Sequence, residues 1–263
     1  VISNHPEVQA AHYLEKAAKE NITASQGQNK PQITGSLNAG GVKEDVNTSS
    51  LTTGLGLNAG ISQLIYDGGY LAGGIGKKTA LYEKAKSNKA LVKNRIGFEA
   101  ASAWVDLWVL REKLKEINYT IQDVNPILED IKRLAKTGLV DRTVVDRIEN
   151  SLLKNSMNKQ KLEMDIELAE LRYENFYGKI PEDIVRPKSS FRLEMFEAKI
   201  KDKSSIPILR FAAAELIASR EEVNSILGEF KPQVNFKLAA NSPLDRNDNA
   251  SLAIGIQSTY TFS

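Results

Sequence analysis

Residues 96–135 read IGFEAASAWVDLWVLREKLKEINYTIQDVNPILEDIKRLA, and this stretch indicates one long coiled-coil helix. Apolar or small residues recur along it in alternating steps of four and three, which is the spacing of a coiled-coil seam. The seam positions are Ile96, Ala100, Ala103, Leu107, Leu110, Leu114, Ile117, Ile121, Val124, Leu128, Ile131 and Ala135. The one strong helix breaker between residues 68 and 137 is Pro126, which we expect to bend the helix or open it locally.

A second seam follows after the short turn GLVDR at residues 138–142. Its positions are Val145, Ile148, Leu152, Asn155, Lys159, Leu162, Ile166, Ala169, Tyr173 and Phe176. Two seams joined by a tight turn predict an antiparallel helical hairpin. A first helix of about 65 residues would be about 100 Å long, which is more than an ordinary globular core needs.

The flanking segments contain an internal repeat at an offset of 201 residues, without a gap. Pro6 aligns with Pro207, Gly27 aligns with Gly228, and the run Lys30-Pro31-Gln32-Ile33 aligns with Lys231-Pro232-Gln233-Val234. Proline suits the first turn of a helix, and the Lys-Pro-Gln run marks a helix end followed by an extended segment. Each repeat is therefore predicted to begin with a helix of about 20 residues and to continue as a strand.

Four segments after these helices alternate between apolar and polar residues, which predicts four β-strands. The apolar positions are Ile33, Leu37, Ala39, Leu51, Leu55, Leu57, Ala59, Ile61, Ile65, Val234, Phe236, Leu238, Ala240, Leu252, Ile254, Ile256, Tyr260 and Phe262. The opposite faces carry small uncharged residues apart from Lys237. Two interpretations remain open: a soluble antiparallel sheet with one wet face, or transmembrane strands of about 9 to 11 residues.

The second interpretation requires an oligomer. Four strands cannot close a barrel, because the smallest barrels have about eight strands. Strand edges inside a bilayer must then be paired between chains.

Composition excludes several classes of function. The 263 residues carry 35 Lys and Arg against 33 Asp and Glu, which argues against nucleic acid as the main partner. Cysteine is absent, so disulfides, thiolate metal sites and cysteine catalysis are excluded within this sequence. No window reaches the roughly 18 to 20 apolar residues of a transmembrane helix, and no signal peptide is visible.

No catalytic, cofactor-binding or metal-binding residue is predicted. The glycine cluster at residues 68–76 lacks the Lys-Ser/Thr ending of a phosphate loop, and we interpret it as a close crossing of strand and helix. Trp104 and Trp108 lie four residues apart and are interpreted as packing residues rather than a ligand clamp. His5 and His12 have no accompanying carboxylate at the spacing of a known metal site.

Five short motifs, in order along the chain, resemble the TolC-like outer-membrane efflux protein family. They are Asn4-His5-Pro6-Glu7-Val8, Ile61-Ser62-Gln63-Leu64-Ile65-Tyr66-Asp67-Gly68-Gly69, Ala100-Ala101-Ser102-Ala103-Trp104, Gly138-Leu139-Val140 and Phe176-Tyr177-Gly178. The resemblance implies an α+β membrane protein with a long antiparallel α-helical coiled-coil hairpin. It also implies four β-strands that each chain contributes to an oligomeric transmembrane β-barrel.

The resemblance further implies a function and partners. The chain is expected to form a homotrimer with a 12-stranded barrel in the outer-membrane lipid of a Gram-negative bacterium, and a helical part in the periplasm. It would be a passive export channel that works with a periplasmic adaptor (membrane fusion) protein and an inner-membrane transporter, in efflux or type I secretion. The alternative is a structural or adaptor-type coiled-coil protein with a soluble sheet, and an enzyme is a more distant third.

The expected organisation has four parts. Residues 1–67 form the first helix and two barrel strands, residues 68–180 the periplasmic hairpin, residues 181–204 a linker, and residues 205–263 the second helix and two strands. Members of the family carry a second hairpin after the fourth strand, so the chain looks trimmed at both ends.

The hairpin turn is the candidate site for docking the adaptor. It comprises Gly138, Leu139, Val140, Asp141, Arg142 and Thr143. Exposed Leu139 and Val140 would bind the adaptor's own hairpin tip, with Arg142 as a polar anchor, although the turn could also simply close the hairpin. The Asp of the family's tip motif falls on Val144 here, so the hydrogen bond that holds the closed state in some relatives is in doubt.

Overall fold

A computed structural model describes residues 2–42, 52–187, 205–242 and 249–260, with side chains of residues 41, 42, 52 and 53 left undescribed. The described residues within Val1–Gln9 and Leu91–Ala198 form one compact unit, the hairpin unit. Those within Ala10–Ala90 and Lys199–Ser263 form a second, the sheet unit. The predictions for Leu51, Phe262 and most of the linker fall outside the described residues.

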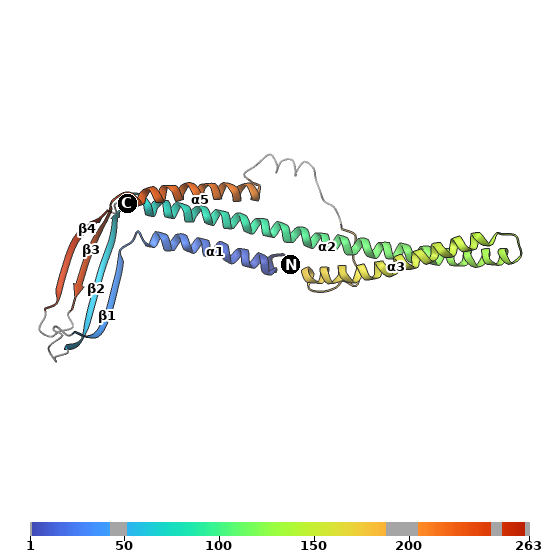
Figure 1. Ribbon diagram of the computed structural model, residues 1–263, viewed down its shortest axis with the longest axis horizontal. Helices are drawn as coiled ribbons and strands as arrows, with labels where there is room; N and C mark the ends of the chain where they lie inside the picture. The colour runs from blue at the N-terminus through green and yellow to red at the C-terminus, as the bar shows by residue number, and fades with distance from the viewer. Residues whose placement is uncertain (1, 43–51, 188–204, 243–248, 261–263) are drawn as a thin grey trace. The chain divides into compact units, whose positions relative to one another are not determined.

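The elements follow the predicted order of helix, two strands, two long helices, helix and two strands (Figure 1). A short 3₁₀ turn, Ile2–Asn4, precedes them. The main elements are α1 (Pro6–Gly27), β1 (Gln32–Val42), β2 (Thr52–Tyr66), α2 (Tyr70–Lys136), α3 (Arg142–Tyr177), α5 (Pro207–Glu229), β3 (Gln233–Asn241) and β4 (Ser251–Thr259). None of the described helices combines the length and apolarity needed to cross a bilayer.

The four strands form one antiparallel sheet in the order β1-β2-β3-β4. Leu37 lies opposite Leu57, and Leu238 lies opposite both Ile61 and Ile254. Directly opposed residues point to the same face of a sheet. The alternation in the four strands is therefore in phase, and one face of the sheet is mainly apolar, with Gln63 opposite Phe236 and Ser258 opposite Val234 as polar exceptions.

A β-bulge interrupts this phase near the end of β2. Leu64 pairs with Asn235, and the next pair joins Tyr66 to Val234, which leaves Ile65 without a partner in β3. Strict alternation therefore ends at Leu64, since Tyr66 and not Ile65 lies opposite Val234. One extra residue at a bulge re-aims the strand as it leaves the sheet, and α2 begins only four residues later at Tyr70.

Asp67 and two glycines carry the chain from β2 into α2. Gly68 and Gly69 have φ angles of 70° and 97°, a region that only glycine enters without strain. The Asp67 carboxylate accepts hydrogen bonds from the backbone N–H groups of Gly69 (2.9 Å) and Leu71 (2.6 Å). These bonds satisfy donors that the first turn of α2 would otherwise leave free.

The start of α2 packs against the end of α5 with backbones in direct contact. A Cβ added at Gly73 would lie 2.5 Å from the backbone nitrogen of Ser225, and one at Gly228 would lie 2.4 Å from that of Tyr70. A Cβ at Gly68 would collide with Lys231. The close backbone approach predicted for the glycine cluster is therefore present, but it joins helix α2 to helix α5 and not strand to helix as predicted.

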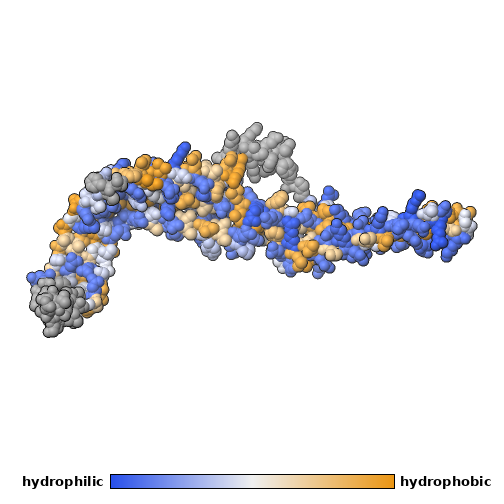
Figure 2. Space-filling model, viewed as in Figure 1, coloured by the Kyte–Doolittle hydropathy of each residue, from blue (hydrophilic) through white to orange (hydrophobic). Residues whose placement is uncertain are grey.

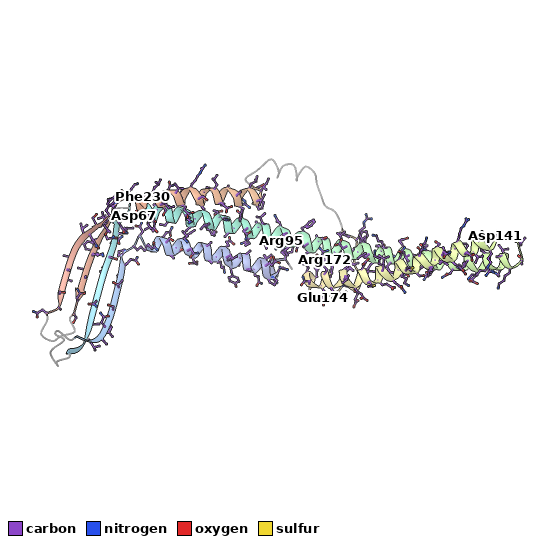
Figure 3. All side chains as sticks on the ribbon, in the orientation of Figure 1. Asp67, Arg95, Asp141, Arg172, Glu174 and Phe230 are labelled. Atoms are coloured by element: carbon purple, nitrogen blue, oxygen red, sulfur yellow. The ribbon has the colours of Figure 1, made fainter. Side chains whose placement is uncertain are left out.

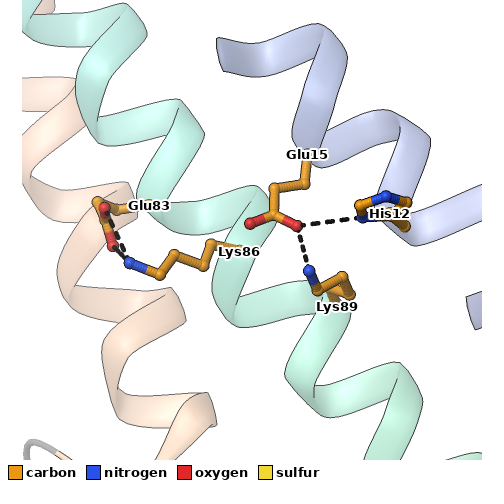
Figure 4. A network of polar contacts seen from close by, with 5 residues as sticks. All are labelled: His12, Glu15, Glu83, Lys86 and Lys89. Atoms are coloured by element: carbon orange, nitrogen blue, oxygen red, sulfur yellow. Dashed lines mark hydrogen bonds and ion pairs between the residues drawn. The ribbon is translucent and has the colours of Figure 1, made fainter. Parts of the chain in front are cut away.

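Ion pairs join the three helices of the sheet unit, some at part-buried and some at exposed positions. Glu15 of α1 pairs with Lys89 of α2 and lies 3.7 Å from His12 (Figure 4). The hydrogen bond from Lys89 lowers the pKa of the Glu15 carboxyl. Two further lysines of α2, Lys77 and Lys84, pair with Glu222 and Glu215 of α5 at 2.7 and 2.8 Å.

The hairpin unit packs along the two predicted seams. Every seam position in α2 and α3 is buried or half-buried, and none is exposed. Leu107 is fully enclosed and packs in a cluster with Ile166, Ala169 and Tyr173 of α3. The antiparallel hairpin predicted from residues 96–176 is therefore confirmed.

Pro126 does not interrupt the helix, because α2 runs continuously from Tyr70 to Lys136. The bend or local opening expected at this proline stays a prediction, because the continuous helix excludes only a full break. Proline removes one backbone donor and displaces one carbonyl, while the rest of the helical bonding can persist on both sides. Val124 and Leu128 keep the seam packed before and after it, and Leu128 is only 6% exposed.

Candidate functional site

The apolar face of the sheet is exposed over β1, β4 and part of β2, and half-buried along β3. Ile33 is 79% exposed, Leu57 61% and Ile254 72%. The other large side chains exposed on this face of the strands are Leu37, Leu55, Leu252 and Ile256. Figure 2 shows hydrophobic residues over the strands. A continuous apolar surface of this kind marks contact with a membrane or with another protein.

The opposite face carries small polar side chains that bond to one another across strands. The Asn58 amide donates to the Ser36 hydroxyl at 3.4 Å, and the Thr34 hydroxyl donates to the Gly60 carbonyl at 3.5 Å. Lys237 is the one charged residue in the four strands. The two faces thus suit two different media, one apolar and one aqueous.

Both outer strands of the sheet have an unpaired edge. β1 pairs only with β2, and β4 pairs only with β3, within the described residues. Each free edge presents a row of backbone N–H and C=O groups that need partners where water is absent. An apolar environment for this sheet therefore requires further strands on both sides.

Exposed aromatic side chains gather where the strands end and the helices begin. Tyr66 and Tyr260 lie at the ends of β2 and β4, and Tyr70 and Phe230 lie at the adjoining ends of α2 and α5. Tyr70 and Phe230 line one open pocket together with Asp67, and Figure 3 labels Asp67 and Phe230 at this junction. Bands of aromatic residues are typical of the level where a barrel meets lipid headgroups.

The turn at residues 138–143 ends α2 with a Schellman motif. Gly138 has a φ of 75°, its N–H donates to the Ala135 carbonyl, and the Leu139 N–H donates to the Leu134 carbonyl. This pattern closes the last turn of a helix around a left-handed glycine. Leu139 is left 75% exposed, whereas Val140 is half-buried.

Asp141 starts the returning helix (Figure 3). Its carboxylate accepts the backbone N–H of Thr143 at 2.8 Å, so Asp141 is the N-cap of α3 and Thr143 is the residue it caps. The same bond lowers the pKa of the Asp141 carboxyl. Arg142 is exposed at the first position of the helix. The turn is thus rigid at its backbone and presents Leu139 and Arg142 outward.

Behind the turn, Lys132 of α2 joins the two helices by bonding Glu149 of α3 and Glu129 of its own helix, each at 3.1 Å. These bonds raise the pKa of Lys132, with Glu149 as the larger cause. They hold the two arms of the hairpin together close to the candidate docking residues.

The tryptophans and histidines singled out in the sequence take part in packing. The Trp104 ring meets the edges of Tyr173 and Tyr177, and its indole N–H donates to the Val185 carbonyl at 3.1 Å. This contact fits the packing role predicted for Trp104.

The other three residues have equally ordinary surroundings. Trp108 lies beneath the Arg186 guanidinium, His5 stacks on Phe176, and His12 adjoins Glu15. Among the described residues, no group of three or more His, Asp or Glu side chains could hold a metal ion.

Two structural residues were missed in the sequence. Asp67 caps α2, and its Asp-Gly-Gly context before a helix is a recognisable cap signal. Arg111 bonds Glu170 at 2.6 Å and the carbonyls of Pro181 and Glu182, which ties the segment after α3 back onto α2. No local pattern could reveal these contacts of Arg111, because its partners lie 59 to 71 residues away.

Comparison with solved structures identifies the fold. The chain matches CusC, described for its transmembrane channel formation, with a TM-score of 0.84 at 12% identity over 100% of this chain and 64% of that one. It matches the outer membrane protein VceC of Vibrio cholerae at 0.84 and 14% identity, over 100% and 67%. The MtrE outer membrane channel of Neisseria gonorrhoeae gives 0.78 and 11%, over 100% and 62%. The chain has the fold of a TolC-like outer-membrane channel.

This TolC-like channel fold was predicted from the five motifs, and the prediction is confirmed at the level of fold. No family model and no curated protein matches the sequence. The chain spans 62% to 67% of the length of the three solved structures.

Proposed function

We propose that the chain is a subunit of a passive export channel in the outer membrane of a Gram-negative bacterium. The observation that carries the proposal is the two-faced sheet with both edges unpaired. Its strands of 9 to 15 residues are long enough for the roughly 9 to 11 residues that a transmembrane strand needs. The apolar face would meet lipid, and the polar face would line the water-filled lumen.

The open edges lead to an oligomer, which we propose is a homotrimer. Four strands from each of three chains would close a barrel of twelve, an even number within the range of outer-membrane barrels. The proposed parts are residues 1–67, 68–180, 181–204 and 205–263, with the sheet in lipid and the helices in the periplasm. A continuous α2 of 67 residues, about 100 Å long, suits such a periplasmic wall.

The partners in this proposal are a periplasmic adaptor protein, docked at residues 138–143, and an inner-membrane transporter that supplies the energy. The solved channels that share this fold support the assignment, since their descriptions name them as outer-membrane or transmembrane channels. They also favour a channel over an enzyme. A structural or adaptor-type coiled-coil protein with a soluble sheet is the weaker alternative, because such a sheet would not leave so many large apolar side chains exposed on one face.

Conductance tests the proposal. The protein, purified from outer membranes, should cross-link as a trimer and open stable conducting pores in planar bilayers. Leu57→Arg should hinder insertion, because arginine facing lipid costs about 2 to 4 kcal/mol near the bilayer midplane. The adjacent Asn58→Arg, on the lumen face, should insert normally. A monomer without conductance, recovered from the soluble fraction, would favour the soluble alternative.

A further inference from the structure

Lys237 is the one charged residue among the 44 residues of the four strands. It lies in the middle of β3, opposite Ser62 on one side and Gly255 on the other. These neighbours put it on the polar face of the sheet. Its side chain is exposed, and the space beside Gly255 is open, since a Cβ built there would meet no atom within 4 Å.

The charge of Lys237 has no counter-charge nearby in the part of the chain that the structure describes. No carboxylate of these residues bonds it. The polar side chains closest to it in the register are those of Ser62, Asn235 and Gln257, and all are uncharged. A lysine with no partner contributes nothing to holding strands together by ion pairing, so its charge is available to whatever fills the space in front of the sheet.

The protein wall enhances the effect of such a charge. A lumen with low-dielectric walls focuses the field of charges that line it and raises the local concentration of ions of opposite sign. Rings of Arg or Lys side chains are a recurrent means of favouring anions in pores. In a symmetric oligomer, every chain would add one Lys237 at the same level.

We propose that Lys237 makes the barrel lumen favour anionic solutes over cationic ones. This inference rests on the proposed function, in which the polar face lines the lumen. It assigns the substrate class as molecules that carry carboxylate, phosphate or other anionic groups. It also accounts for the position of the lysine, because on the opposite face its charge would meet lipid.

The test is the reversal potential of the purified protein in planar bilayers under a KCl gradient. Replacing lysine by glutamine in Lys237→Gln should lower the chloride-to-potassium permeability ratio by about two- to threefold, the change expected when roughly half a kT of local potential acts with opposite sign on the two ions. Lys237→Arg should keep the ratio of the unchanged protein. The effect should grow below about 0.1 M salt, where the screening length exceeds roughly 10 Å.

A relocated charge separates a field effect from a structural one. In the double variant Lys237→Gln with Gln257→Lys, the charge moves to the neighbouring strand on the same face. We expect this variant to regain the anion preference. Each variant differs from the unchanged protein only at the substituted residues. Charges elsewhere in the pore therefore contribute equally to both permeability ratios and do not affect the comparison.

The outcomes separate this inference from the proposed function. If the pores conduct but Lys237→Gln leaves the permeability ratio unchanged, the inference is wrong and the channel assignment stands. A ratio that falls in Lys237→Gln and does not recover in the double variant also contradicts it, since the lysine would then act through local structure. If no pore forms in any variant, the proposed function fails and the inference fails with it.

Discussion

Gly73 and Gly228 allow α2 and α5 to approach until their backbones touch. The atoms nearest to a Cβ added at Gly73 are the backbone N and Cα of Ser225 and the carbonyl of Glu221, all within 2.9 Å. Backbone atoms cannot rotate away as a side chain can, so the helices themselves would have to separate. The Ser225 hydroxyl bonds the Tyr70 carbonyl at 2.9 Å and would move with them.

Gly73→Ala should therefore lower the free energy of unfolding by about 1 to 3 kcal/mol, the usual cost of overpacking. The adjacent Gly74→Ala is the matched control, because its Cβ would lie 3.9 Å from the nearest atom, the Ser225 hydroxyl. It should be neutral, or stabilising by up to about 1 kcal/mol from helix propensity. Urea unfolding followed by far-UV circular dichroism measures both, and equal effects would contradict the close crossing.

Asp141 makes the start of α3 sensitive to pH. Its folded pKa is lowered because the ionised carboxylate accepts the Thr143 N–H. A group with a lowered pKa contributes its stability above the ordinary carboxyl value of about 4 and loses it as the pH falls through the lowered folded value. The first turn of α3 should consequently open more readily in acid.

Amide hydrogen exchange at Thr143 and Val144 measures this opening. Asp141→Ala should lower the protection at neutral pH, because alanine cannot cap. Asp141→Asn should keep most of the protection, since asparagine also caps, but should lose its dependence on pH. An Asp141→Asn variant with the same acid sensitivity as the unchanged protein would show that another group is responsible.

At the scale of elements, periodicity predicted the hairpin because every contact in it repeats locally. The seam from Ile96 to Ala135 places one side chain per half-heptad against the partner helix, and this spacing is visible in the sequence. Strand alternation predicted the four strands, and the internal repeat predicted the two helix-strand segments, for the same reason. The bulge at Ile65 was not predictable, since it depends on which residues of β3 lie opposite.

Long-range contacts of single side chains within this chain were equally unpredictable from the local sequence. Arg111 bonds carbonyls 70 and 71 residues away, and Lys89 bonds Glu15 across 74 residues. Pro126 lies within the continuous helix α2, whose seam stays packed at Val124 and Leu128 on either side of it. For the candidate docking turn, the sequence indicated the cap and the exposed leucine, but it did not indicate that Val140 is half-buried.

The hairpin turn carries a prediction at this scale. Changing Leu139 and Val140 to Ser, or Arg142→Glu alone, should abolish export while trimer yield and membrane insertion stay normal. The reason is that the turn's backbone is held by Gly138 and Asp141, so its outward side chains are free for a partner.

Leu153→Ser is the control, since Leu153 is 59% exposed on α3 away from the turn. Export assays in cells that lack the native gene copy, with cross-linking for trimer, measure the result. Full export by the turn variants would contradict the docking role, and loss of trimer would show that the turn is structural.

At the scale of the whole molecule, two copies of a helix-strand repeat supply strands to one sheet, and that sheet has two unpaired edges. β2 and β3 come from different repeats and pair with one another, which leaves β1 and β4 as the edges. No local sequence pattern predicts how many chains close the barrel. It came from the resemblance and stays a proposal.

We propose that one face of the sheet meets lipid and the other meets water, and single labels on neighbouring residues test this assignment. The 263 residues contain no cysteine, so Leu57→Cys and Asn58→Cys each introduce one labelling site in this chain. A fluorophore on each, in lipid vesicles, is exposed in turn to a quencher attached to lipid tails and to a water-soluble quencher. The label at residue 57 is expected to respond to the lipid quencher and the label at residue 58 to the aqueous one. Equal response of both labels to the aqueous quencher would contradict the assignment.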